Sequence, residues 1–211
     1  MMTAARPKTD DRMVGLAAFT QRRKRASREQ LLDAATQLFH DKGYYSVSVD
    51  DIAGLAGVSR MTFYRHFKSR AAILMELFER NSAEVLPQLL SIADQDYRDP
   101  AIVRAWIEGI FDADWSGRHI LRAIAQAVRM DREFVEAAQS FITGFVDGLG
   151  EKIPAFAADP AGTERKSWLE GWLIVYEILD QSNQATLDMG LGRDPLVMEL
   201  LTERFVGFVT R

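Results

Sequence analysis

The chain has 211 residues, of which 47% are hydrophobic and 27% charged, the balance of an ordinary globular protein. It has no apolar run of transmembrane length, no signal peptide and no cysteine, which excludes disulfides and thiolate metal sites and favours a cytoplasmic location. The net charge of −4 is unevenly distributed: residues 1–70 carry 13 Lys and Arg against 7 Asp and Glu, and residues 71–211 carry 13 against 23. A basic head on an acidic body indicates that the head binds phosphates.

We expect residues 1–26 to form a flexible N-terminal arm, because this stretch is polar and contains proline. Within it, Arg22, Arg23, Lys24 and Arg25 form a basic cluster directly before the first expected helix. Such clusters are typical of arms that enter a minor groove or follow the DNA backbone. The same cluster also fits a solvated tail that serves only solubility.

Residues 27–72 are predicted to form a small helical domain. Ser27 is expected to cap its first helix, and Gly43 is expected to end it. The apolar residues of this helix recur at helical spacing and should brace the two helices that follow. They are Leu31, Ala34, Ala35, Leu38 and Phe39.

Two short helices joined by a tight turn are predicted over residues 48–67. Ser48 and Asp51 have the spacing of a capping box at the start of the first helix. Gly57 can leave that helix with a positive φ, and Ser59 can cap the second helix. Two helices joined by a short turn containing Gly form a helix-turn-helix, whose second helix lies in the DNA major groove.

The second of these helices carries many hydrogen-bond donors on its exposed face. Arg60, Thr62, Tyr64, Arg65 and His66 lie within one short segment. Side chains of this kind are suited to phosphates and base edges. A helical hairpin that binds nothing also uses Gly at its turn, but it has no need of such a face.

Residues 52–70 resemble the DNA-binding signature of TetR-type bacterial transcriptional regulators; they read IAGLAGVSRMTFYRHFKSR. The match extends back through LLDAATQLFHDKGYYSVSVDDIA and covers roughly residues 27–74. Met61 stands where many members carry a small residue, and Arg70 stands where the family usually has Lys. The resemblance implies an all-α fold, with an N-terminal three-helix helix-turn-helix DNA-binding domain and a C-terminal helical bundle that binds an effector and dimerises.

The position of the motif leads to a set of predicted DNA contacts. Arg60, Met61 and Thr62 open the recognition helix, and we predict that they contact bases. Other side chains are expected to hold phosphates and set the register on DNA. They are Ser48, Ser59, Tyr64, His66 and Arg70.

Residues 73–211 are predicted to form the helical effector-binding and dimerisation domain. Ser69 can cap a long helix that Pro87 should kink or end, because proline lacks an amide donor. Further breaks are expected at Asp99–Pro100, at Ser116–Gly117, around Asp131, at Pro154 to Gly162 and at Gly190 to Pro195.

The helix predicted over residues 164–183 is apolar nearly all round, and the last helix, with Asp194 as cap and Pro195 at its first position, has an apolar face. A helix apolar on several sides must be covered on more than one side, and the simplest second cover is another copy of the chain. The family resemblance also implies dimerisation through the last two helices. A monomer that buries both helices is the alternative. The predicted homodimer interface comprises Leu173, Ile174, Ile178, Val197, Leu201, Phe205 and Phe208.

The body contains enough aromatic side chains to line an apolar ligand pocket between helices. The resemblance implies a small-molecule effector, although each aromatic residue also fits an ordinary core position. Asp180 lies beside the apolar face and fits an anchor for a cationic or hydroxylated ligand, a determinant of dimer register or an exposed helix end. The candidate pocket residues are Trp106, Ile110, Phe111, Trp115, Phe141, Phe145, Trp168, Trp172, Tyr176 and Asp180.

The sequence offers little for catalysis. None of His40, His66 and His119 has another His or a Cys at metal-ligand spacing, and no nucleophile elbow or phosphate-binding glycine loop occurs. We predict no enzyme activity, no cofactor and no metal. The expected function is that of a repressor released from a palindromic double-stranded DNA operator by a small apolar or aromatic effector. The alternative is a DNA-binding regulator without such a ligand, whose body serves dimerisation or a protein partner.

Overall fold

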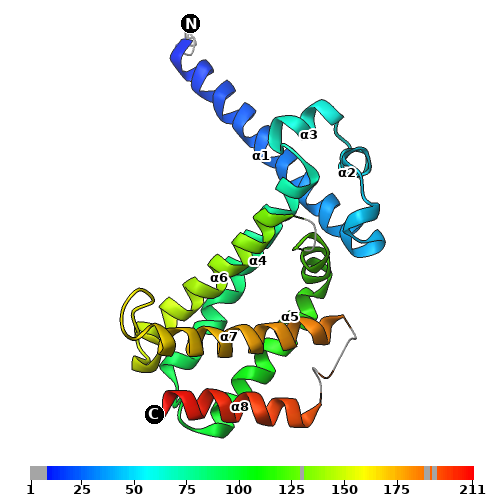
Figure 1. The fold of residues 1–211 in the computed structure, drawn as a ribbon. Helices are drawn as coiled ribbons and strands as arrows, with labels where there is room; N and C mark the ends of the chain where they lie inside the picture. Colours follow the sequence, from blue (N-terminus) through cyan, green and yellow to red (C-terminus); the bar gives the residue numbers. More distant parts are fainter. Residues whose placement is uncertain (1–8, 129–130, 188–190, 192–193) are drawn as a thin grey trace, which may run out of the picture. The chain divides into compact units, whose positions relative to one another are not determined.

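The structure is a computed structural model that describes residues 9–128, 131–187, 191 and 194–211 (Figure 1). Within these ranges the protein is helical and contains no strand, as the all-α prediction requires. No helix in the described part of the chain is long and apolar enough to span a bilayer. The chain divides into two compact units, Met1–Ile73 and Leu74–Arg211, and the boundary falls inside helix α4 (Arg70–Leu90).

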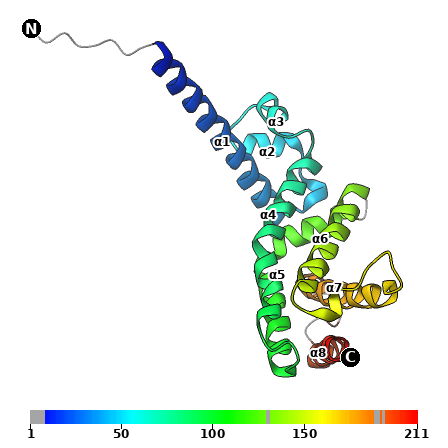
Figure 2. The same cartoon turned by 90° about the vertical axis from the view of Figure 1, so that its left-hand side faces the viewer.

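The first unit is built on a long helix, α1 (Thr9–Lys42), against which α2 (Val49–Leu55) and α3 (Arg60–His66) pack. A short 3₁₀ turn, η1 (Tyr44–Ser46), connects α1 to α2. Figure 2 shows that α1 continues well beyond its contact with the two shorter helices. Five side chains with almost no exposed surface form the centre of the small core that holds the three helices together: Leu31, Leu32, Phe39, Ile52 and Phe63.

The capping predictions for the two short helices are confirmed. The Ser48 hydroxyl accepts from the Asp51 amide at 3.1 Å, and the Asp51 carboxylate accepts from the Ser48 amide at 2.9 Å, which completes a capping box. Gly57 has φ 66°, a conformation that glycine adopts without steric cost. The Ser59 hydroxyl accepts from the Thr62 amide at 3.1 Å and starts α3. These caps set the direction of α3 relative to α2.

The predicted start of the first helix is wrong. Helix α1 begins at Thr9 and runs through Ser27, whose hydroxyl donates to the Arg23 carbonyl one turn earlier at 3.0 Å instead of capping. The residues between these points are rich in Ala, Arg, Lys and Gln, all of which have high helix propensity. Residues 9–26 are therefore helical, and the basic cluster projects from a helix rather than from an extended tail.

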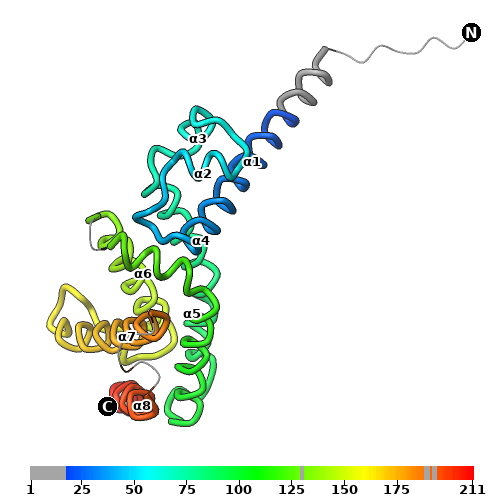
Figure 3. The backbone as a smooth tube through the Cα atoms, turned by 90° about the vertical axis from the view of Figure 1, so that its right-hand side faces the viewer, coloured from blue at the N-terminus to red at the C-terminus, as the bar shows by residue number. Residues whose placement is uncertain are grey.

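In its described residues the second unit has five helices and two 3₁₀ turns: α4 (Arg70–Leu90), η2 (Ser91–Asp94), α5 (Pro100–Val128), α6 (Arg132–Gly150), η3 (Pro154–Phe156), α7 (Arg165–Thr186) and α8 (Pro195–Val209). Helix α5 contacts α6, α7 and α8, and α7 also contacts α6 and α8. Figure 3 shows α7 and α8 next to each other. Helix α4 lies against α6, where the Phe78 and Phe141 rings have centroids 6.1 Å apart.

The expected break at Ser116–Gly117 is wrong. Pro87 does not end its helix, and the alternative of a kink at Pro87 stays a prediction. Helix α5 continues through Ser116 and Gly117, and Ser116 keeps its hydroxyl within the helix by donating to the Asp112 carbonyl at 2.9 Å. A Cβ at Gly117 would lie 3.4 Å from the Asn81 Oδ1, which is an ordinary van der Waals contact. Helix α4 runs past Pro87 to Leu90. The predicted cap and start of α8, at Asp194 and Pro195, are confirmed.

A large apolar core joins α5 to α8. The Trp106 ring lies 5.2 Å from that of Phe205, centroid to centroid, and its indole N–H donates to the Leu89 carbonyl at 3.1 Å. Phe156 of η3 closes the end of this core, with ring centroids 5.8 Å from Phe205 and 5.0 Å from Phe208. The aromatic residues of the body are thus divided between this packed core and the cavity described below.

Candidate nucleic-acid interface and ligand cavity

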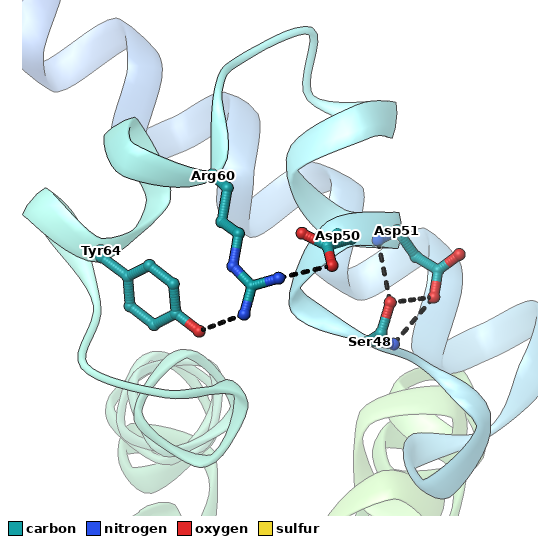
Figure 4. A network of polar contacts seen from close by, with 5 residues as sticks. All are labelled: Ser48, Asp50, Asp51, Arg60 and Tyr64. Carbon is teal, nitrogen blue, oxygen red and sulfur yellow. Dashed lines mark hydrogen bonds and ion pairs between the residues drawn. The ribbon is translucent and has the colours of Figure 1, made fainter.

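Helix α3 presents its first residues to solvent in the first unit. Met61 is 82% exposed, so this large apolar residue contributes little to packing within its own chain. The Arg60 guanidinium donates to the Asp50 carboxylate at 2.8 Å and to the Tyr64 hydroxyl at 3.4 Å, as Figure 4 shows. These contacts raise the pKa of Arg60, first through the Tyr64 hydrogen bond and then through the Asp50 charge. Arg60 is therefore held in one direction at the start of the helix.

The other predicted contact residues near the turn have their hydroxyls at helix caps. Ser48 and Ser59 are exposed residues whose hydroxyls cap α2 and α3. Thr62 is half-buried, and its hydroxyl lies 3.0 Å from that of Ser59. Tyr64 is 47% exposed, and its hydroxyl faces Arg60. These hydroxyls thus all have partners within the first unit.

Two of the predicted phosphate contacts, His66 and Arg70, have surroundings that differ from those of the other predicted contact residues. The Nε2 atom of His66 is buried and has no hydrogen-bond partner among the described residues. Burial, together with the charges of Arg65, Lys24 and Arg28, lowers the pKa of His66 and favours the neutral ring. The phosphate contact of His66 stays a prediction.

The Arg70 side chain makes its contacts within the first unit. Its guanidinium donates to the carbonyls of Tyr45 at 3.2 Å and Val47 at 2.6 Å, and it lies 4.2 Å from the centroid of the Tyr44 ring. These contacts hold the turn before α2. A lysine has too few fixed donors to make the same set of contacts, which gives a physical reason for arginine here.

Sequence reasoning missed how α1 borders the helix-turn-helix. A groove in this unit is lined by Arg23 and Lys24 of α1, by Ser59 and by Arg65 of α3, and by residues of the turn between α2 and α3. Three of these side chains are cationic, so the groove extends the positive surface from the recognition helix along α1. The basic cluster at residues 22–25 was visible in the sequence, but its position beside the turn depends on the continuation of α1.

The second unit contains a cavity of about 400 Å³ between α4, α5, α6 and α7. Four of the predicted pocket residues line it: Ile110, Phe141, Tyr176 and Asp180. The prediction missed the wall that α4 supplies, including Phe78 and Val85. It also missed Asp114, although this residue follows Ile110 by one turn on the same face of α5.

The other predicted pocket residues do not line this cavity. Trp106, Phe111 and Phe145 are buried in the core, and Trp168 and Trp172 pack against that core. The Trp172 ring stacks on Tyr176 with centroids 5.5 Å apart. Trp115 lies beneath the Arg118 guanidinium, 4.8 Å from the ring centroid. Helical spacing identified these residues as inward-facing, but the sequence could not separate core from cavity wall.

The predicted interface residues are mostly buried within their own chain. Ile174, Ile178, Leu201, Phe205 and Phe208 all belong to the core of the second unit, so they cannot be the side chains that meet a partner. Val197 packs against the same core, whereas Leu173 is 53% exposed. The large apolar side chains that α7 and α8 leave exposed are Leu169, Leu173, Tyr176, Leu196 and Leu200.

The geometry of the first unit is that of a helix-turn-helix domain. The sequence profile of "Bacterial regulatory proteins, tetR family" matches residues 31–77. The chain is 30% identical over 144 residues to the HTH-type transcriptional regulator EthR of Mycobacterium tuberculosis, an alignment that covers 67% of this chain and 60% of EthR. The chain thus belongs to the TetR family of bacterial transcriptional regulators.

Solved structures of other proteins share the fold. SCO7518 from Streptomyces coelicolor A3(2) superposes with a TM-score of 0.65 at 18% identity, over 88% of this chain and 99% of that one. SmeT, the repressor of the Stenotrophomonas maltophilia multidrug efflux pump SmeDEF, gives 0.58 at 21% identity, over 82% of this chain and 87% of SmeT. A structure of SmeT in complex with triclosan is also similar, with a TM-score of 0.57.

Proposed function

We propose that this protein is a sequence-specific DNA-binding transcriptional regulator, a homodimeric repressor that a small molecule releases from a palindromic operator. The observation that carries the proposal is the start of α3, where Arg60 and the 82%-exposed Met61 stand on a surface that also bears Tyr64. An exposed helix start of this kind is what base contacts in the major groove require. The named relatives EthR and SmeT are a transcriptional regulator and a repressor, which supports the class.

The charge distribution supports binding through the first unit alone. Residues 1–70 carry an excess of six positive charges by the counts of 13 basic and 7 acidic residues, and the remainder of the chain is acidic. Arg23 and Lys24 beside the turn extend the cationic surface, where they would contact the DNA backbone. Arg60 and Met61 would then read bases while these residues hold phosphates.

The proposed dimer uses the exposed side chains of α7 and α8 rather than the core residues first predicted. Leu169, Leu173 and Tyr176 follow one another along α7 at helical spacing, and Leu196 and Leu200 do so along α8. Exposed leucines and an aromatic ring on two contacting helices favour a self-complementary interface. A two-fold dimer would place two recognition helices on one palindrome.

The ligand part of the proposal rests on the cavity in the second unit. Its volume of about 400 Å³ and its mostly apolar wall are typical of small-molecule sites. The SmeT–triclosan complex shows that SmeT, which has the same fold, binds a small molecule. A ligand would release the operator by favouring the conformation in which the two heads no longer fit successive major grooves.

The proposal is tested by selection of duplexes from a random-sequence DNA pool on the purified protein, followed by sequencing. We expect a palindrome, and we expect Arg60→Ala to weaken its binding by about 10- to 100-fold, the cost of one bidentate base contact. Arg132→Ala is the matched control, because it removes an exposed arginine of α6 in the acidic unit. Recovery of no preferred sequence, or equal effects of the two variants, would contradict sequence-specific binding.

A further inference from the structure

The charged side chains that the described residues place on the cavity wall are all of one sign. Among the described residues that line the cavity, those with charge are Asp114 of α5 and Asp180 of α7, and none is Lys, Arg or His. The rest of the wall is largely apolar and includes Phe78, Phe141 and Leu179. An anionic head group would therefore meet two carboxylates and no cation from the described lining residues, whereas a cationic head group would meet its complement.

Asp114 is the more constrained of the two carboxylates. Its Oδ2 atom accepts from the Ser182 hydroxyl at 2.6 Å, and Ser182 itself has no exposed surface. Burial raises the pKa of Asp114 to about 6, although the Ser182 hydrogen bond acts in the opposite direction. At neutral pH the group is thus mainly a carboxylate held in a poorly solvated place, which is costly unless a positive charge pairs with it.

The arginine that follows Asp114 by one helical turn is engaged elsewhere. The Arg118 guanidinium donates to the Trp115 carbonyl at 2.8 Å and lies over the Trp115 ring. A second acceptor lies on α7, next in the chain to Ser182: the Oδ1 atom of Asn183 is buried and has no hydrogen-bond partner in the described part of the chain. The cavity thus offers a carboxylate and an amide oxygen to a group that donates several hydrogen bonds.

We propose that the ligand of this cavity is an amphiphilic amine, with its ammonium group paired to Asp114 and its apolar tail against the aromatic wall. An ammonium has several N–H donors, so it can satisfy Asp114 and Asn183 together and also neutralise part of the negative field of Asp180. The apolar tail removes water from the ring surfaces of Phe78 and Phe141. This inference rests on the proposed ligand-responsive function and narrows the chemistry of the effector.

The test uses three probes that share a decyl tail and differ in head charge: decylamine, 1-decanol and decanoate. Their binding to the full-length protein is measured by isothermal titration calorimetry at neutral pH. We expect decylamine to bind at least about tenfold more tightly than either of the others, as a partly desolvated charge pair requires. We also expect decylamine, but not decanoate, to weaken operator binding.

Two variants test whether Asp114 is the source of the preference for decylamine. Asp114→Asn keeps the size of the side chain and an acceptor for Ser182 but removes the charge, and it should abolish the preference for decylamine. Asp112→Asn is the matched control, because Asp112 is an exposed carboxylate on the same helix and it should leave the preference intact. Unchanged binding of 1-decanol, or an unfolding temperature no lower than that of the wild type, shows that the Asp114→Asn substitution has kept the cavity folded.

Several results would overturn the inference. Equal affinities of the amine and the alcohol for the wild-type protein would do so without reference to any variant, as would binding by none of the three probes. A preference that survives Asp114→Asn would remove the assigned partner. Failure of the proposed function has a different signature, because the protein would then select no DNA sequence even if decylamine bound as expected.

Discussion

The guanidinium of Arg60 is held 2.8 Å from the carboxylate of Asp50, across the turn of the helix-turn-helix. Both side chains are more than half exposed, so the pair does little for the stability of the first unit. The ion pair matters for DNA binding, because Asp50 both orients the Arg60 guanidinium and competes with DNA for it. An acidic residue beside a base-reading arginine penalises non-specific contact with phosphates and favours sites where the arginine gains a better partner.

Asp50→Asn is therefore expected to raise affinity for random-sequence DNA by roughly threefold to tenfold and to reduce the ratio of operator to random binding. The physical reason is the loss of one negative charge and of the acceptor that orients Arg60. Fluorescence anisotropy with an operator duplex and a scrambled duplex measures both quantities. Asp33→Asn is the control, since Asp33 is an exposed carboxylate of α1 in the same unit. If the two variants changed DNA binding equally, Asp50 would act on DNA binding only through its net charge.

Arg70→Ala is expected to destabilise the first unit by about 2 kcal/mol, because it removes a charged donor from two backbone carbonyls. Thermal or urea unfolding of the full chain, followed by circular dichroism, checks this expectation. The neighbouring Lys68→Ala removes the same charge from an exposed side chain and should leave stability unchanged. If Arg70→Ala instead weakened DNA binding with no loss of stability, its role would be the phosphate contact first predicted.

Asp114 makes stability depend on pH in a defined direction. Its folded-state pKa is raised from 3.8 to about 6, so between these values the native state holds more protons than the unfolded state. Unfolding free energy should therefore fall as pH rises through this window, by up to about 3 kcal/mol at 1.36 kcal/mol for each pKa unit. Asp180 and Tyr176, both of α7, are the other titratable groups on the described cavity wall; α4 and α6 contribute none.

The check on this pH effect is denaturant unfolding of the wild-type protein and Asp114→Asn at several pH values. The variant should gain stability relative to the wild type as pH rises and should lose that advantage in acid. Binding of decylamine should strengthen over the same window, because the amine pairs with the carboxylate. A difference between the two proteins that is independent of pH would contradict the assignment of the titration to Asp114.

Leu173→Glu is expected to convert the dimer to a monomer, because it places a charge on the exposed apolar face of α7. Analytical ultracentrifugation of the two proteins at micromolar concentration measures the change. Leu55→Glu is the matched control, since Leu55 is an exposed leucine of the first unit. A Leu173→Glu protein that remained dimeric would locate the interface elsewhere, and a monomeric wild type would exclude the dimer altogether.

Local sequence patterns determined much of this protein. The capping box at Ser48 and Asp51, the positive φ of Gly57 and the cap at Ser59 each depend on atoms within a few residues of one another, so they are legible in the chain itself. The same holds for the start of α8. The uneven charge distribution and the helix-turn-helix motif likewise follow from the order of the residues alone.

The other features of the protein depend on which groups from distant parts of the chain come into contact, so only the tertiary structure decided them. Helical periodicity marks a side chain as inward-facing, but it does not say whether that side chain meets another, as Trp106 meets Phe205, or borders a cavity, as Phe141 does. It placed Ile178 on an apolar face, and only the packing of α7 against α5 assigned that face to the core. The partners of Arg60 and Arg70 were settled in the same way, since a long charged side chain can reach several acceptors and folding selects one of them.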